Sequence, residues 1–174
     1  MVKYLCPRFL VHMKIEQILD SFGDKLYTYL SIKLSSFQDA EDVLQEVCYR
    51  LVKYQVKFRF VRSPSAYLFR MARNEAVSCL KQRREHQANP YSVEEISQVI
   101  QNSITAPDLN VLNKASDTLA KIPDDQREVI VLKFFGELTF KEIARVCGVS
   151  MGTITSRYRY GMQKLSTILE DKDG

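Results

Sequence analysis

The stretch LTFKEIARVCGVSMGTITSRYRYG, residues 138–161, has the pattern of a helix-turn-helix. Thr139 and Glu142 can form a capping box, in which each side chain bonds to the other residue's backbone N–H at the start of a helix. Gly148 suits the left-handed turn that ends this helix, and Ser150 is a good N-cap for the next one. The second helix of such a motif enters the major groove of duplex DNA. The stretch therefore predicts a DNA-reading element, with an ordinary helical hairpin as the competing interpretation.

The second helix of this motif, expected over residues 150–169, has an inward and an outward face. Ile154, Tyr158 and Leu165 share the inward face. Outward residues in the first turns would reach base edges and adjacent phosphates. The DNA contacts expected from this geometry are Thr153, Thr155, Ser156, Arg159 and Tyr160, with Arg157 on the flank and Lys133 on the preceding helix as a phosphate contact.

A second segment, YLFRMARNEAVSCLKQRR at residues 67–84, combines cations with a ring and an amide on one helical face. Its expected buried stripe is Leu68, Met71, Ala72, Ala76, Cys79 and Leu80. The opposite face carries Tyr67, Arg70, Arg73, Asn74, Val77, Lys81 and Arg84. Cations follow phosphates, a ring stacks on bases and an amide can read a base edge. The face is thus suited to a single nucleic-acid strand, although a solvated helix face is the simpler interpretation.

The loop before this helix extends the same surface, because aromatic and basic residues alternate in it. These residues are Lys57, Phe58, Arg59, Phe60 and Arg62.

A third segment, DAEDVLQEVCYRLVKY at residues 39–54, is an amphipathic helix. Its expected core face is Ala40, Val43, Leu44, Val47 and Leu51. Its polar face carries Asp42, Gln45, Glu46, Tyr49 and Lys53. That face either meets solvent or docks a basic helical partner.

Helical periodicity dominates the rest of the chain, and no alternating strand pattern is convincing. Helices are expected at residues 15–34, 39–54, 65–84, 109–120, 124–135, 139–147 and 150–169. Residues 86–110 are rich in Asn, Ser and Gln and contain two prolines, which indicates a flexible linker with one weak helical turn near residues 94–100. The predicted fold class is all-α, with two small helical domains joined by this linker.

Composition argues against several classes of function. The chain of 174 residues has 45% hydrophobic and 26% charged residues, which is ordinary for a globular protein. Its four cysteines include no CxxC pair and its only histidines are His12 and His86, so neither a disulfide scaffold nor a metal site is expected. No glycine-rich phosphate loop is present, which disfavours an enzyme. Without a signal peptide or a long apolar run, the sequence predicts a cytoplasmic protein.

Positive charge gathers in two separate stretches. Residues 61–86 hold six basic and two acidic residues, and residues 143–169 hold four basic residues and no acidic one. Residues 87–113, between them, hold three acidic residues and no Lys or Arg. Two basic stretches separated by an acidic gap suggest two polyanion-binding surfaces.

In their order along the chain, the segments at residues 39–54, 67–84 and 138–161 resemble the extracytoplasmic-function (ECF) sigma factors of bacterial RNA polymerase. DAEDVLQEVCYRL resembles the AEDLVQE-type helix of sigma region 2, and YLFRMARN resembles its WLYRIARN-type helix. The run from Ile122 to Gly161 resembles sigma region 4. The resemblance implies region 2 at residues 1–86, a linker at 87–111 and region 4 at 112–174.

The resemblance also implies roles for the three surfaces. The polar helix face would bind core RNA polymerase, the single-strand face would capture the melted −10 element, and the helix-turn-helix would read the −35 duplex with the contacts given above. The helices over about residues 115–135 would dock on the polymerase flap. The residues implied for core binding are Asp42, Gln45, Glu46 and Tyr49. Those implied for the −10 element are Phe60, Arg62, Tyr67, Arg70, Arg73, Asn74 and Lys81.

The same resemblance implies a promoter-specificity subunit with no catalytic residue, metal or cofactor. Its partners would be core polymerase, promoter DNA and an anti-sigma factor, with no direct membrane insertion. Tyr67 stands where the family often has Trp, which weakens the expected stacking. The competing class is a dimeric helix-turn-helix regulator that binds duplex DNA without core polymerase.

Overall fold

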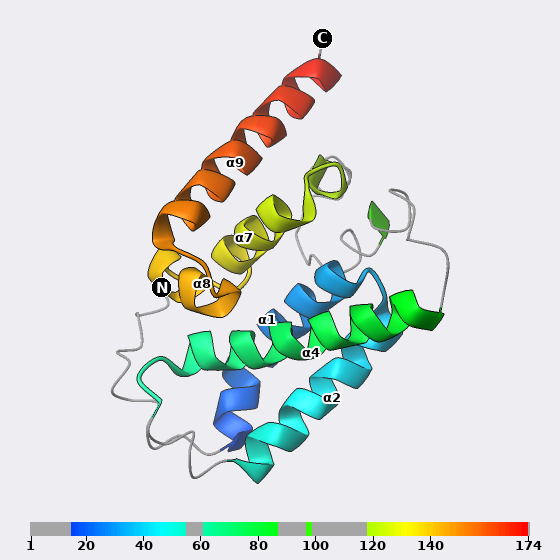
Figure 1. Ribbon diagram of the computed structural model, residues 1–174, viewed down its shortest axis with the longest axis vertical. Coiled ribbons are helices and arrows are strands. Elements are labelled where there is room, and N and C mark those ends of the chain that lie inside the picture. The colour runs from blue at the N-terminus through cyan, green and yellow to red at the C-terminus, as the bar shows by residue number, and fades with distance from the viewer. Residues whose placement is uncertain (1–14, 55–60, 87–96, 99–117, 174) are drawn as a thin grey trace.

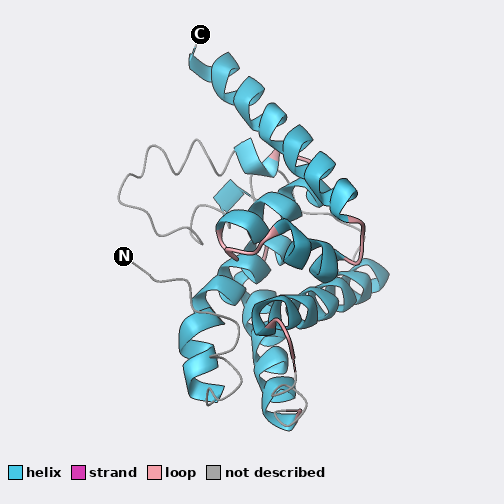
Figure 2. Cartoon of the chain, turned by 90° about the vertical axis from the view of Figure 1, so that its left-hand side faces the viewer, coloured by secondary structure: helices cyan, strands magenta, loops and turns pink. Residues whose placement is uncertain are grey.

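The computed structural model describes residues 15–54, 61–86, 97–98 and 118–173, and the regular structure within these segments is helical (Figures 1 and 2). The helices are α1 (Ile15–Leu34), α2 (Phe37–Lys53), α4 (Pro64–His86), α7 (Asp124–Phe134), α8 (Phe140–Cys147) and α9 (Met151–Asp173). The all-α prediction is confirmed. Of the expected helix over residues 109–120, only residues 118–120 are described, and they are helical.

Local chemistry explains where the first helices begin. The Ser36 hydroxyl accepts a hydrogen bond from the backbone N–H of Asp39 over 3.2 Å and so caps α2. The turn before it places Ser35 in the left-handed region, at a φ of 51°. Pro64 opens α4, where its missing N–H costs nothing because the first N–H groups of a helix have no partner within it.

The helices form two bundles, with α1, α2 and α4 in one and α7, α8 and α9 in the other (Figure 1). In the first bundle, the fully buried Tyr29 of α1 meets Phe69 of α4 edge to face, with the ring centroids 5.7 Å apart. In the second, α7 and α9 approach closely at Gly161, where an added Cβ would lie 2.8 Å from Cδ1 of Ile130. Buried side chains fill both bundles, and together they form one hydrophobic core.

The two bundles are in contact with each other, because α4 packs on α8 and α1 touches α7. Phe69 Cζ lies 3.3 Å from the position that a Cβ on Gly136 would take, so a side chain there would crowd the contact. Phe69 is completely buried although the stripe expected from periodicity omits it. Met71 and Cys79, which the stripe includes, are only partly buried. Part of the interior of α4 therefore belongs to the contact between the bundles.

The C-terminal half of α9 extends beyond the rest of the molecule (Figures 1 and 2). Within the described part of the chain, no helix combines the length and the apolar character needed to span a membrane.

Candidate nucleic-acid and polymerase interfaces

The polar face of α2 presents an aromatic ring among polar groups. Asp42, Gln45 and Tyr49 are exposed, and the Tyr49 side chain reaches 59% exposure. Lys53 lies beside this ring, with Nζ 5.6 Å from its centroid. An exposed tyrosine bordered by polar groups is the kind of anchor that protein interfaces use.

Glu46 differs from its neighbours, because its carboxylate is already paired. Arg50 Nε donates to Glu46 Oε1 over 2.6 Å, while Arg50 Nη1 lies 2.6 Å from Oε1 of Glu75 on α4. The hydrogen bond to Glu46 is the main cause of a raised pKa for Arg50. Arg50 thus links α2 to α4, a role that sequence reasoning missed. Its only sequence signal is the four-residue spacing from Glu46.

Most residues expected on the outward face of α4 are exposed. The exposed ones are Arg62 in the preceding loop, then Tyr67, Arg70, Asn74, Val77, Lys81 and Arg84. Phe60 lies outside the described residues. A ring, an amide and several cations share this surface, which is the combination that single-stranded nucleic acid requires.

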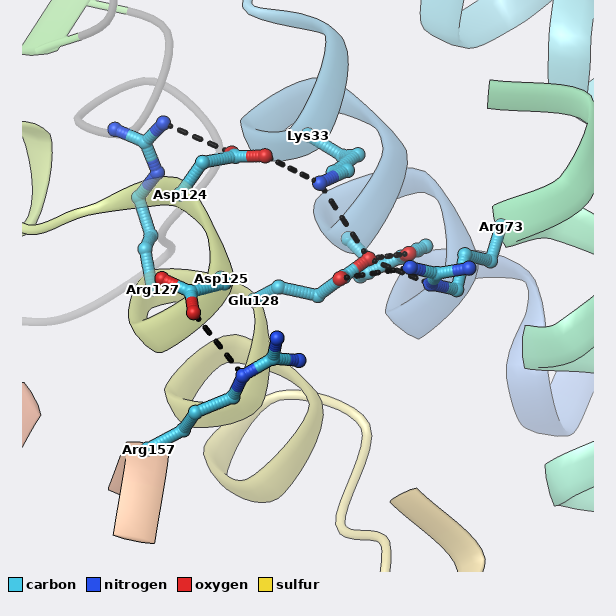
Figure 3. Close-up of polar contacts among 8 residues, drawn as sticks. Lys33, Arg73, Asp124, Asp125, Arg127, Glu128 and Arg157 are labelled. Carbon is cyan, nitrogen blue, oxygen red and sulfur yellow. Dashed lines mark hydrogen bonds and ion pairs between the residues drawn. The ribbon is translucent and has the colours of Figure 1, made fainter. Parts of the chain in front are cut away.

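Arg73 is the exception on this face, because it turns toward the second bundle (Figure 3). Its Nε donates to Oε1 of Glu128 on α7 over 3.2 Å. The same carboxylate oxygen accepts from the Tyr29 hydroxyl over 2.8 Å, and Glu128 is only 5% exposed. Burial is the main reason that the pKa of Tyr29 lies well above its ordinary value, and the Glu128 charge adds to it. Sequence reasoning missed Glu128.

The helix-turn-helix has the caps that its sequence predicts. Thr139 Oγ1 accepts from the Glu142 backbone N–H over 3.3 Å, and Glu142 Oε2 accepts from the Thr139 N–H over 2.9 Å. Gly148 ends α8 at a φ of 70°, and Ser150 Oγ accepts from the Thr153 N–H over 3.1 Å. These bonds fix where α8 ends and α9 begins.

The first turns of α9 present a mixed polar and aromatic surface. Thr155, Arg159 and Tyr160 are exposed, whereas Thr153 and Ser156 are half-buried. The Arg159 guanidinium lies over the Tyr160 ring at 5.0 Å and donates to its hydroxyl over 3.3 Å. Ile154 on the opposite side is fully buried, as expected.

Arg157 and Lys133 lie differently from the expectation. Arg157 Nε lies 3.0 Å from Oδ2 of Asp125 on α7, so its charge is directed at α7 and away from the outward face of α9 (Figure 3). Lys133 Nζ donates to the Leu138 carbonyl over 3.2 Å and lies 5.3 Å from the Phe140 ring centroid. The structure therefore brings neither cation to the surface that carries Arg159.

Phe134 is an exposed aromatic residue that the sequence did not single out. It is 56% exposed at the end of α7 and stacks on Tyr158 of α9, with the ring centroids 6.4 Å apart. It lies within the segment, about residues 115–135, that the resemblance assigns to the polymerase flap.

Comparison with known families matches both halves of the chain. The family description Sigma-70 region 2 matches residues 18–86, and Sigma-70, region 4 matches residues 118–167. The ECF RNA polymerase sigma factor EcfG of Rhodopseudomonas palustris (strain TIE-1) is 30% identical over 143 residues, covering 80% of this chain and 76% of the relative. The chain belongs to the ECF sigma factors.

Other relatives of this sigma factor agree in length. The ECF RNA polymerase sigma factor SigW of Bacillus subtilis (strain 168) is 27% identical over 164 residues, covering 88% of each chain. Among solved structures, the sigma factor RpoE in complex with the anti-sigma factor NepR from Bartonella quintana is similar with a TM-score of 0.72 and 26% identity, covering 89% of this chain and 96% of that one. The predicted sigma fold and function are confirmed. The alternative of a dimeric regulator is set aside, because it has no place for region 2.

Proposed function

We propose that this sigma factor binds core RNA polymerase through the exposed face of α2, captures the melted −10 strand on α4 and reads the −35 duplex with α9. The observation that carries the proposal is the order of three exposed faces along two matched sigma regions. Each face has the chemistry its partner needs: polar groups around an aromatic anchor on α2, cations with a ring and an amide on α4, and a helix-turn-helix at α9. The proposed division is region 2 at residues 1–86, a linker at 87–111 and region 4 at 112–174.

The proposed −10 surface comprises Phe60, Arg62, Tyr67, Arg70, Arg73, Asn74 and Lys81. The exposed Tyr67 and Asn74 lie on α4 together with exposed cations. Stacking on an exposed ring contributes roughly 1–3 kcal/mol per base, and the amide can discriminate between base edges. Arg73 can join this surface only after it leaves Glu128.

The proposed −35 surface comprises Thr153, Thr155, Ser156, Arg159 and Tyr160, and Lys133 would join it as a phosphate contact after it leaves the Leu138 carbonyl. Arg159 is the strongest candidate for base readout, because a guanidinium can bond two acceptors of guanine in the major groove. Arg157 would have to leave Asp125 before it could reach DNA.

The protein acts as a promoter-specificity subunit and performs no chemistry of its own, and we place it in the cytoplasm with the polymerase that it serves. An anti-sigma factor is proposed as a further partner. The support is the similarity to RpoE, whose structure contains the anti-sigma factor NepR.

Transcription reconstituted with core polymerase and a library of promoter fragments tests the function. We expect the complete mixture to initiate transcription on a subset of the library, and core polymerase alone to do so weakly.

Permanganate footprints then test the −10 surface on a selected promoter. Asn74→Ala should reduce the reactivity of the melted bubble more than it reduces closed-complex binding. Gln82→Ala, an exposed amide change farther along the same helix, is the matched control. Initiation that does not depend on this chain would overturn the function.

A further inference from the structure

Two neighbouring side chains of α9, Arg159 and Tyr160, contact each other on the surface proposed to meet the −35 duplex. The Arg159 guanidinium lies over the Tyr160 ring, 5.0 Å from its centroid. Arg159 Nη2 also donates to the Tyr160 hydroxyl over 3.3 Å. Both residues are exposed, so the contact lies where DNA would approach the helix. The ring face and the hydroxyl thus restrain the same guanidinium.

This contact leaves the positive charge of Arg159 available. Residues 143–169 contain no acidic residue, and the phenol ring of Tyr160 is uncharged. Arg157, in contrast, pairs with Asp125 over 3.0 Å. A cation paired with a carboxylate must leave it before it can bind DNA, whereas a cation held by a neutral ring still attracts phosphates and base acceptors. Tyr160 therefore restrains Arg159 without competing with DNA for its charge.

Restraint matters for an arginine because its long side chain has many rotamers. Ordering such a side chain on binding costs conformational entropy. Readout of guanine needs a defined position, because two N–H groups of the guanidinium must meet the N7 and O6 acceptors together. The bond to the Tyr160 hydroxyl uses Nη2, and further N–H groups of the guanidinium remain for such a pair. A guanidinium that is already held loses less entropy when it meets the base.

Tyr160 is well placed to act as a rigid support. Its side chain has only two rotatable torsions, so it is stiffer than that of arginine. The next residue, Gly161, is buried, and an added Cβ there would lie 2.8 Å from Cδ1 of Ile130 on α7. The backbone that carries Tyr160 is therefore packed closely against another helix. Groups that are supported by rigid elements hold a binding geometry more precisely than groups on mobile ones.

We infer that Tyr160 is a positioning residue for −35 readout, which holds the Arg159 guanidinium ready for guanine and reads no base of its own. This inference rests on the proposed function, in which α9 reads the −35 duplex. It implies that a single −35 position depends on both residues. The specificity of this sigma factor at that position then comes from the pair.

The test transcribes a randomised −35 library with core polymerase and full-length variants of the sigma factor. Arg159→Ala first identifies the position at which the preference for guanine is lost. Tyr160→Ala should reduce the preference for guanine at that same position by about three- to tenfold. Tyr160→Phe keeps the ring and removes only the hydroxyl, so it should retain more of the preference. Thr167→Ala, an exposed change farther along α9, is the matched control and should leave the preference unchanged.

The double variant separates positioning from direct readout. If Tyr160 acts through Arg159, adding Tyr160→Ala to Arg159→Ala should have no further effect on base preference at any −35 position. Additive effects, or a preference that Tyr160→Ala changes at a different position, would show that Tyr160 reads a base itself. Either result would overturn the inference, and so would an unchanged preference in Tyr160→Ala.

A measurement on the free chain tests the restraint without promoter DNA. NMR relaxation of the Arg159 Nε–H group reports the order of the guanidinium, and Arg159→Lys assigns its signal. We expect Tyr160→Ala to lower the order parameter of this group by about a third, while circular dichroism shows an unchanged fold. Equal order in wild type and Tyr160→Ala would refute the restraint.

Failure of the inference can be distinguished from failure of the proposed function. If Arg159→Ala relaxes one −35 position and Tyr160→Ala does not, only the inference is wrong. If the wild-type holoenzyme initiates transcription with no base preference in the −35 library, the proposed readout by α9 fails and the inference fails with it.

Discussion

Ser63 at the entry to α4 donates a hydrogen bond to Glu142 of α8 over 2.7 Å, although the two residues are 79 positions apart in the sequence. Glu142 also caps its own helix through Thr139. One carboxylate thus serves both the start of the helix-turn-helix and the contact between regions 2 and 4.

Acid should weaken the folded state through Glu142. Burial raises its pKa, but the hydrogen bonds from Thr139, Ser63 and Ser65 outweigh burial and hold it below the ordinary value of 4.5. A carboxyl whose pKa is lower in the folded state stabilises that state fully at pH values above its ordinary pKa. This stabilisation is lost as the pH falls through the lowered pKa. We expect the free energy of unfolding to fall below about pH 4.5. In urea titrations at several pH values, Glu142→Gln should show a shallower fall, and an unchanged slope would refute this assignment.

Substituting alanine at two glycines, Gly136 and Gly23, should change the stability of the fold in opposite directions. A Cβ on Gly136 would lie 2.6 Å from the Leu132 carbonyl oxygen and 3.3 Å from Phe69 Cζ, so Gly136→Ala should destabilise the fold by about 1–3 kcal/mol. Gly23 lies within α1 with nothing within 4 Å of an added Cβ, so Gly23→Ala should stabilise the fold by about 0.5–1 kcal/mol. Chemical denaturation measures both, and equal shifts of the same sign would contradict the packing described.

Substitutions on the exposed face of α2 should weaken core-polymerase binding without unfolding the chain. Tyr49→Ala removes the exposed ring and should lower the affinity by about tenfold, because aromatic anchors dominate interface energies. Gln45→Ala should have a smaller effect in the same direction. Gln82→Ala, an exposed glutamine change on α4, is the control. Quantitative pull-down with core polymerase measures the affinities. If Tyr49→Ala and Gln45→Ala both bind like wild type, this face of α2 contacts only solvent.

Arg159 and Lys133 should affect promoter choice differently. Arg159→Ala should relax the preference at one −35 position, because an arginine paired with guanine contributes roughly 1–3 kcal/mol of discrimination. Lys133→Ala should weaken all promoters alike and reduce the salt-dependence slope by about one unit. A randomised −35 library transcribed with each variant distinguishes the two effects. If Arg159→Ala weakens every promoter equally, Arg159 contacts only phosphate.

Cys147 should be the least reactive thiol of the described cysteines. Burial is the main cause that raises its pKa to about 11, and the nearby Glu128 charge adds to it. Cys48 and Cys79 are only half-buried, and burial raises the pKa of each. Iodoacetamide labelling of the native chain at pH 8, followed by mass spectrometry, should modify Cys147 last. Labelling in urea should remove the difference, and fast native labelling of Cys147 would contradict its burial.

Local patterns in the sequence determined the helices and the helix-turn-helix. A cap such as Thr139 with Glu142 joins residues three positions apart, and the turn at Gly148 depends on that residue's own backbone freedom. Helical periodicity likewise placed Gln45, Tyr67 and Arg159 on outward faces, because the angle between successive residues depends only on the helix. These features need no knowledge of the rest of the fold.

Only the tertiary structure decided which charges remained available on those faces. Arg73 turns to Glu128, 55 positions away, and Arg157 turns to Asp125, 32 positions away. Phe69 is buried because α4 also packs on α8. Periodicity gives the direction in which a side chain leaves its own helix, whereas its partner depends on which other helix packs there. That packing brings together residues from distant parts of the chain, and no local pattern specifies it.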